Sequence, residues 1–192
     1  MKKLLLLACA GCFFIPALSA QQLTETAALL FKDVKTKLSV KEKNEIATQL
    51  GFISSGNNSM PFALDKDSKE YAFAAAVFPS DMNKDGKEEV FVVFGNSFTS
   101  GNTGSSVSLF IKDATGKYAP QLGFPGMAPD VLHTASKGYP DLLIGGPGME
   151  YPVWRWDGKA YNLHRTVNDK GYETLKKMNL ADVSKAYTAS IH

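Results

Sequence analysis

The chain of 192 residues has the apolar content of a globular protein, with 44% hydrophobic and 21% charged residues. This composition excludes a disordered or collagen-like chain and favours one domain of ordinary size. The formal net charge of +2 excludes the strongly basic surface by which many proteins bind nucleic acids.

The first 20 residues have the pattern of a secretory signal peptide. Two lysines precede an apolar run over residues 4–15, and a proline followed by small residues (16–20) suits cleavage. The apolar run is too short to span a bilayer, which needs about 20 residues. We therefore predict a signal peptide at 1–20 and one exported globular domain at 21–192, located in the periplasm or outside the cell.

A lipid anchor at Cys9 or Cys12 is the alternative to a soluble exported form. The apolar stretch before either cysteine is short for such a signal, so we favour the soluble form. Both cysteines of the chain fall in the predicted signal peptide, and the exported domain therefore has no thiol. Removing Lys2 and Lys3 from the 21 basic residues leaves 19, which balance the 19 acidic ones.

Residues 21–52 are predicted to be helical. Apolar residues recur at helical spacing from Leu23 to Leu38. Ser39 and Glu42 form a capping-box pattern that begins a second helix, and Gly51 ends it.

Residues 71–166 are predicted to be β-rich, because short apolar or alternating runs replace the helical spacing. The Asp-Gly pair at 157–158 predicts a two-residue hairpin turn, which would pair Trp154 with Tyr161. We interpret Trp154 and Trp156 as part of an aromatic core face and not as a carbohydrate-stacking platform.

Helical spacing returns over residues 172–188. The predicted fold class is therefore α+β, with N-terminal helices, a β-rich antiparallel middle and a short C-terminal helix. Either one curved sheet or two packed sheets would satisfy the pattern of the middle part.

The most specific motif is the acidic stretch from residue 81 to residue 89. Side-chain oxygens fall at loop positions 1, 3, 5 and 9, a glycine follows at position 6 for the turn, and position 7 offers its backbone carbonyl. Hard oxygen ligands at this spacing are typical of Ca²⁺ sites. The predicted metal ligands, for a structural calcium ion, are Asp81, Asn83, Asp85, Lys87 and Glu89.

The acidic loop differs from an EF-hand, because position 12 is Val92 and an apolar strand follows. Residues Asp81–Gly95 instead resemble the calcium loops of FG-GAP-type repeats, in which an Asp-x-Asn-x-Asp-Gly turn leads straight into an apolar strand. The resemblance implies a calcium-stabilised turn and no particular activity. A turn rich in Asp and Asn that binds nothing is the alternative.

A weak internal repeat follows from a shift of 52 residues, which places Glu89 on Asp141. The segment Gly138–Gly145 again looks like an FG-GAP-type strand, but its loop has lost the ligands. The positions of Asp81, Asn83 and Asp85 are taken by His133, Ala135 and Lys137. The Lys137 ammonium is a candidate replacement for the missing ion, and chance similarity is the alternative.

Long glycine-containing stretches follow the two matched strands, at 95–106 and 145–152. If the strands are equivalent, both loops leave the same edge of the sheet and can form one recognition surface. Phe98, Met149 and Tyr151 are the predicted partner-binding residues, because aromatic residues and methionine are favoured at interfaces. Two passive connections are the alternative.

Recognised catalytic motifs are missing from the sequence, so no catalytic residue is predicted. We expect an exported, non-catalytic binding protein with a calcium-stabilised loop, which recognises or inhibits another envelope or secreted protein. Neither a nucleic acid nor stable membrane insertion is expected. The alternatives are a small exported hydrolase that uses Glu88, His133 or His164, and a structural part of a larger β assembly.

Overall fold

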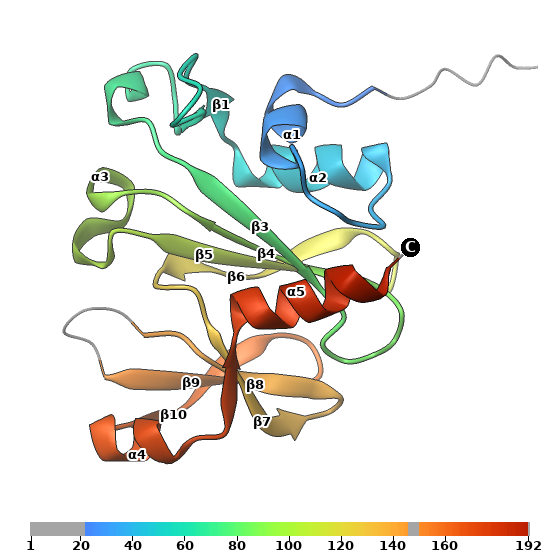
Figure 1. Cartoon of the computed structure of the whole chain (residues 1–192), viewed down its shortest axis with the longest axis vertical. Helices are drawn as coiled ribbons and strands as arrows, with labels where there is room; N and C mark the ends of the chain where they lie inside the picture. Colours follow the sequence, from blue (N-terminus) through green and yellow to red (C-terminus); the bar gives the residue numbers. More distant parts are fainter. Residues whose placement is uncertain (1–21, 146–149, 192) are drawn as a thin grey trace, which may run out of the picture.

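Two stacked antiparallel sheets and their flanking helices form the fold that the computed structural model describes for residues 22–145 and 150–191 (Figure 1). The fold class is α+β and β-rich, with a short C-terminal helix, as predicted. Of the two arrangements considered for the middle part, two packed sheets are observed. The predicted signal peptide, with Cys9 and Cys12, and the predicted contact residue Met149 lie outside the described residues.

The first sheet has four strands in the order β3-β4-β5-β6. Its strands are β3 (Ala75–Ser80), β4 (Glu89–Phe94), β5 (Ser106–Lys112) and β6 (Tyr118–Pro125). The second sheet has five strands in the order β10-β9-β8-β7-β11. Its strands are β7 (Asp130–Ser136), β8 (Tyr139–Leu143), β9 (Tyr151–Trp156), β10 (Tyr161–Val167) and β11 (Lys177–Asn179). Each sheet is thus a meander of four consecutive strands, to which β11 adds an edge in the second.

A helical layer covers the outer face of the four-stranded sheet (Figure 1). It consists of α1 (Glu25–Leu30) and α2 (Val40–Leu50), next to the small sheet of β1 (Ile53–Ser54) and β2 (Phe62–Ala63) and the short helix η1 (Lys69–Tyr71). Buried residues of both helices pack against β4 in one cluster. Figure 1 therefore shows three layers, with the four-stranded sheet in the middle.

The second predicted helix is confirmed together with its capping box. The Ser39 hydroxyl accepts the Glu42 N–H at 3.3 Å, the Glu42 carboxylate accepts the Ser39 N–H at 2.8 Å, and α2 ends at Gly51. The helical spacing before it runs on to Leu38, but α1 ends at Leu30. Leu38 reaches the core from the segment between the helices, so its burial imitates a helical pattern.

An apolar cluster lies between the two sheets. Phe91 and Leu109 contribute from the four-stranded sheet, while Leu142 and Trp156 contribute from the five-stranded sheet. On the other face of β4, Val92 packs against the helical layer. The middle sheet is thus buried on both faces at β4, which explains why this central strand reads as a continuous apolar run after Glu89.

The predicted two-residue turn at 157–158 is wrong. Trp156 pairs with Tyr161 and Trp154 pairs with Leu163, because the Asp157 carboxylate accepts two backbone N–H groups at 2.7 and 2.9 Å and closes a longer loop. This register differs by two residues from the predicted one, so each side chain keeps its predicted face. Trp156 lies in the cluster between the sheets and Trp154 packs against it, which confirms the aromatic core face.

The predicted C-terminal helical region contains two helices with β11 between them. The helix α4 (Asp169–Thr174) packs under the five-stranded sheet, and α5 (Leu180–Ser190) lies alongside β3 (Figure 1). Leu180 and Val183 of α5 join the cluster between the sheets. Among the described residues, no helix combines the length and the apolar character needed to cross a membrane.

Phe91 provides a test of the packing between the sheets, because its side chain is fully buried there. We expect Phe91→Ala to lower the free energy of unfolding by about 3–5 kcal/mol, through lost burial and the cavity left behind. Phe98→Ala is the matched control: Phe98 is 55% exposed, and we expect its loss to cost less than about 1.5 kcal/mol. Urea unfolding measures both, and equal losses would contradict the described core.

Candidate metal centre

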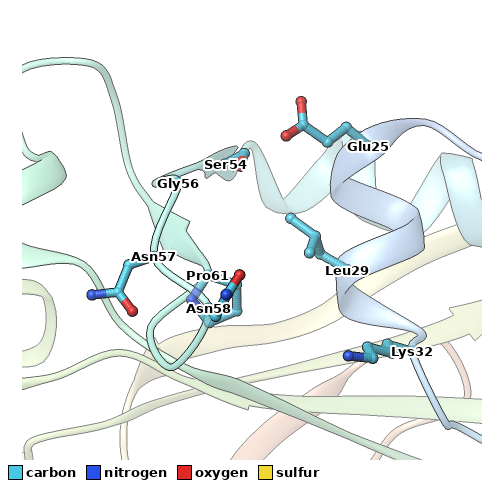
Figure 2. A pocket seen from close by; sticks show the side chains of 8 residues that line it. All are labelled: Glu25, Leu29, Lys32, Ser54, Gly56, Asn57, Asn58 and Pro61. Carbon is cyan, nitrogen blue, oxygen red and sulfur yellow. The ribbon is translucent and has the colours of Figure 1, made fainter.

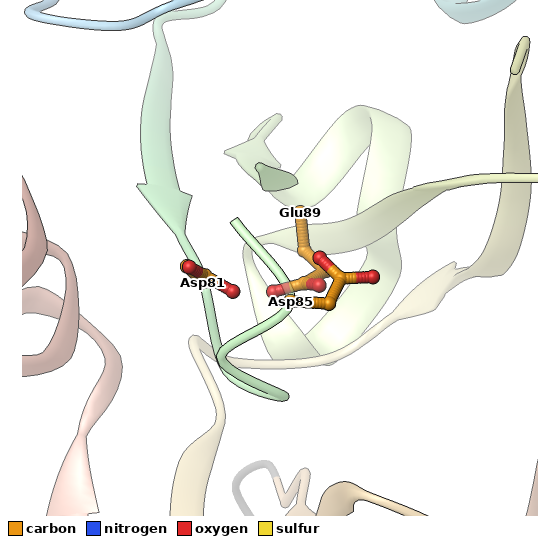
Figure 3. Close-up of side chains that lie close together, drawn as sticks. All are labelled: Asp81, Asp85 and Glu89. Carbon is orange, nitrogen blue, oxygen red and sulfur yellow. The ribbon is translucent and has the colours of Figure 1, made fainter. Parts of the chain in front are cut away.

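Three carboxylates converge where β3 passes into β4. Asp81 follows the last residue of β3, Asp85 lies in the turn, and Glu89 begins β4. Antiparallel pairing of Ser80 with Glu89 brings the two ends of the loop together. Each of the three side chains offers an oxygen, and these oxygens all lie within 4.8 Å of one another (Figure 3). The structure thus brings together three of the five predicted metal ligands.

Hydrogen bonds from the loop backbone hold the acidic side chains in place. The Gly86 N–H donates to Asp81 Oδ2 at 3.1 Å, and the Lys87 N–H donates to Asp85 Oδ1 at 2.8 Å. Asn83, the fourth side chain predicted to bind metal, accepts the Asp85 N–H at 3.1 Å through Oδ1. Gly86 has a φ of 84°, which a residue with a side chain rarely adopts. The loop therefore curls, with its carboxylates turned toward one another.

The centre concentrates negative charge around one buried carboxylate, with Asp81 half-buried and Asp85 exposed. Glu89 is 1% exposed, and this burial, together with the charges of Asp81 and Asp85, raises the pKa of its carboxyl to about 8. The Met82 N–H opposes this shift by donating to Glu89 Oε2 at 2.6 Å. Asp81 Oδ1 is buried without a hydrogen-bond partner among the described residues. A bound cation would satisfy this oxygen and offset the repulsion between the carboxylates.

Glu88, the neighbour of the centre, is also buried but has a different role. Its carboxylate accepts hydrogen bonds from the Thr36 hydroxyl, the Lys37 N–H at 2.8 Å and the Tyr187 hydroxyl at 3.0 Å. Its backbone carbonyl accepts the Tyr118 hydroxyl at 2.9 Å. Glu88 thus ties the segment after α1, β6 and α5 to the start of β4. Burial and the Glu88 charge raise the pKa of Tyr187.

In the second segment of the predicted repeat, the acidic residue pairs with a cationic side chain from β9. Strands β4 and β8 are both second in their meanders, so Glu89 and Asp141 occupy comparable strands. Asp141 is fully buried and forms an ion pair with Arg155 at 2.7 Å. Lys137, the candidate replacement for the missing ion, donates instead to the Asp157 carbonyl. Sequence reasoning missed Arg155, although its alternation with the two tryptophans already placed it on the opposite face of β9.

The two predicted partner-binding residues that the structure describes, Phe98 and Tyr151, lie in two separate aromatic pairs. Phe98, in the short helix α3 (Ser97–Ser100) that with η2 (Gly101–Thr103) fills the loop after β4, stacks on Tyr71 with centroids 3.9 Å apart. Tyr151, at the start of β9, stacks on Tyr172 at 4.3 Å. Residue 105, at the end of the first loop, and residue 145, at the start of the second, both flank the connection from β6 to β7, because backbone hydrogen bonds join residues 126 and 105 and residues 127 and 145. The two aromatic pairs belong to different layers.

The residues named for a hydrolase do not share a site. Glu88 is occupied by the hydrogen bonds given above, and His133 and His164 are exposed on β7 and β10. A hollow of about 560 Å³ lies elsewhere, between α1 and the β1–β2 loop (Figure 2). Figure 2 shows Glu25 and Leu29 of α1, and Lys32 just after its end, opposite the loop. None of the described lining residues is a histidine or a cysteine.

Comparison with protein-family models, curated proteins and solved structures finds no match to this chain. The resemblance of Asp81–Gly95 to FG-GAP-type loops stays a prediction from the residues themselves. What the centre can do therefore follows from its chemistry, which is that of an all-oxygen site with three acidic side chains.

The buried Glu89 predicts a pH dependence of stability that calcium removes. In a chelator, the folded protein keeps this carboxyl protonated up to about pH 8, whereas the unfolded chain releases the proton near the ordinary pKa of 4.5. Since the folded state binds the proton more tightly, the free energy of unfolding falls as the pH rises through this window. We expect a fall on the order of 2–4 kcal/mol in urea unfolding, and a flatter curve in saturating Ca²⁺.

Glu89→Gln removes the titrating group and should flatten the curve in chelator. Glu70→Gln, at an exposed position of η1, is the matched control and should keep the slope of the wild-type protein. Identical slopes in all three proteins would show that Glu89 does not titrate in this window.

Proposed function

We propose that this protein is an exported, non-catalytic binding protein whose β3–β4 loop binds Ca²⁺. The observation that carries the calcium part is the convergence of three carboxylate oxygens within 4.8 Å, with the buried and unpartnered Asp81 Oδ1 beside them. Asp81, Asp85 and Glu89 supply charged ligands, the Asn83 amide supplies a neutral oxygen, and Lys87 supplies its carbonyl.

The chemistry of the donors favours calcium over transition metals. All the donors are hard oxygens, which suit Ca²⁺ or Mg²⁺, whereas zinc and copper sites usually include histidine or cysteine. Ca²⁺ accepts the irregular, many-oxygen arrangement that a curled loop provides, and Mg²⁺ demands a near-ideal octahedron. The resemblance to FG-GAP-type loops supports the same choice. We expect an affinity of about 10⁻⁴–10⁻³ M, as in other extracellular modules.

The ion would stabilise the junction of the two sheets. Glu89 begins a strand of the middle layer, and Tyr139 approaches it from the five-stranded sheet. Burial and the Glu89 charge raise the pKa of Tyr139. Met82, in the loop itself, packs against the cluster between the sheets. A cation held by the loop therefore reinforces contacts of both layers, which is a structural role.

The binding role rests on the exposed aromatic residues and on the loops that carry them. Phe98 and Tyr71 are 55% and 42% exposed and stack on each other, which forms a rigid apolar surface. Large rigid aromatic side chains are favoured at protein interfaces. The partner would be another envelope or secreted protein, such as an enzyme that this protein inhibits.

Calcium titration tests the metal site directly. We expect isothermal titration calorimetry to detect one Ca²⁺ per chain, and Asp85→Asn to weaken the affinity by about tenfold or more through loss of a charged ligand. Asp113→Asn is the matched control, because Asp113 forms a similar turn with backbone N–H groups at 2.8 and 3.1 Å. Flat traces for the wild-type protein, or equal affinities in both variants, would refute the site.

Affinity capture tests the binding role. We expect the immobilised protein to retain one stoichiometric partner from envelope extract in Ca²⁺, and Phe98→Ala to reduce the retained amount by about tenfold. Met178→Ala, which changes another exposed apolar side chain (45%), serves as the control. Failure to retain any stoichiometric partner, with or without a chelator, would count against the binding role. The calcium site is tested separately by the titration described above.

A further inference from the structure

A second hollow lies at the β9–β10 end of the five-stranded sheet, away from the acidic loop. Its volume is about 350 Å³, within the range of small-molecule sites. It opens beside the turns that join β7 to β8 and β9 to β10. Its principal lining residues are Lys137, Arg155, Trp156, Asn162, Leu163 and His164.

Arg155 is held in a fixed orientation at this hollow. Its Nε donates to Asp141 Oδ1 at 2.9 Å and its Nη2 donates to Asp141 Oδ2 at 2.7 Å. The Thr134 hydroxyl donates to the same carboxylate at 2.6 Å. The Asp141 side chain is fully buried, whereas that of Arg155 is 35% exposed. One edge of the guanidinium is therefore locked, and Nη1 has no hydrogen bond to any described residue.

The other polar groups of the hollow favour an anion. The Lys137 ammonium donates to the Asp157 carbonyl and so stays at the rim with its charge. The Asp157 carboxylate already accepts two backbone N–H groups at 2.7 and 2.9 Å and the Asn162 amide at 2.9 Å. The negative charges of the hollow are thus satisfied by local donors, while Arg155 and Lys137 keep free N–H groups.

An apolar side chain also lines this hollow. Leu163 is 58% exposed, the highest value among the large hydrophobic side chains of the described residues. The exposed leucine and the fixed guanidinium line the same hollow, which therefore offers both parts of a site for an amphipathic acid. A planar carboxylate matches the guanidinium edge better than a single point charge does.

We propose that this hollow binds a small organic acid, whose carboxylate accepts hydrogen bonds from Arg155 and whose apolar body lies on Leu163. Lys137 adds a second positive charge at the rim, which offsets the pairing of Arg155 with Asp141. This site shares no residue with the calcium loop or the aromatic pairs, so its test is independent of the tests of the proposed function.

Nuclear magnetic resonance titration with benzoate tests the site, with benzamide as the neutral molecule of the same shape. We expect benzoate to shift the amide signals of residues 155 and 162–164. Benzamide should bind at least about tenfold more weakly than benzoate. Inorganic phosphate tests the apolar contribution and should also bind about tenfold more weakly. No shift with benzoate, or equal affinities for benzoate and either comparison compound, would overturn the proposal.

Variants assign the binding to the named groups. The double variant Asp141→Leu/Arg155→Met removes both members of the ion pair, so that no unpaired charge is left buried, and should abolish benzoate binding. Lys137→Asn suits the positive φ of 48° at this position and should weaken binding about threefold. Lys66→Asn, at an exposed site distant in sequence, is the control. Unchanged benzoate affinity in Lys137→Asn and in the double variant would overturn the proposal, and Lys137→Asn keeps the test valid if the double variant does not fold.

Discussion

Two consecutive buried carboxylates at the start of β4 are the constraint around which the other layers are arranged. Glu88 is 3% exposed and Glu89 is 1% exposed, and alternation along the strand sends them to opposite faces of the middle sheet. A buried charge needs partners, and the two faces supply different ones. Glu88 finds three neutral donors from two distant segments, whereas Glu89 faces two further carboxylates and needs a cation or a proton.

This division of partners explains how the layers hold together. The donors to Glu88 come from the segment after α1 and from α5, so its hydrogen bonds join both ends of the described chain to the middle sheet. Glu89 lies at the boundary with the five-stranded sheet, close to Tyr139. In that second sheet, Asp141 meets the same requirement through Arg155. The two meanders thus bury comparable acidic groups and neutralise them by different means.

Local sequence patterns predicted much of the fold and the spacing of the acidic loop. The capping box at Ser39, the turn at Gly86 and the faces of the tryptophan strand depend on residues close in sequence, and all were predicted. The hairpin register at Asp157 was wrong because the side chain of that residue closes a longer loop than Asp-Gly usually forms. The partners of Glu88 are 51, 52 and 99 residues away, a separation at which no periodicity carries information. The pairing of Asp141 with Arg155 likewise depends on the tertiary arrangement of β8 and β9.

The place of β11 has a consequence for the order of folding. This strand, at residues 177–179, pairs with the start of β7, more than forty positions earlier in the chain, and α5 directly after it brings Tyr187 to Glu88. The edge of the five-stranded sheet and the hydrogen bonding of Glu88 in the four-stranded sheet therefore both depend on residues near the end of the chain. Contacts so distant in sequence slow the final step and disfavour a stable partial fold during synthesis. Under the proposed export, such a chain would reach a membrane translocation channel while still largely unfolded, which is the state that threading through such a channel requires.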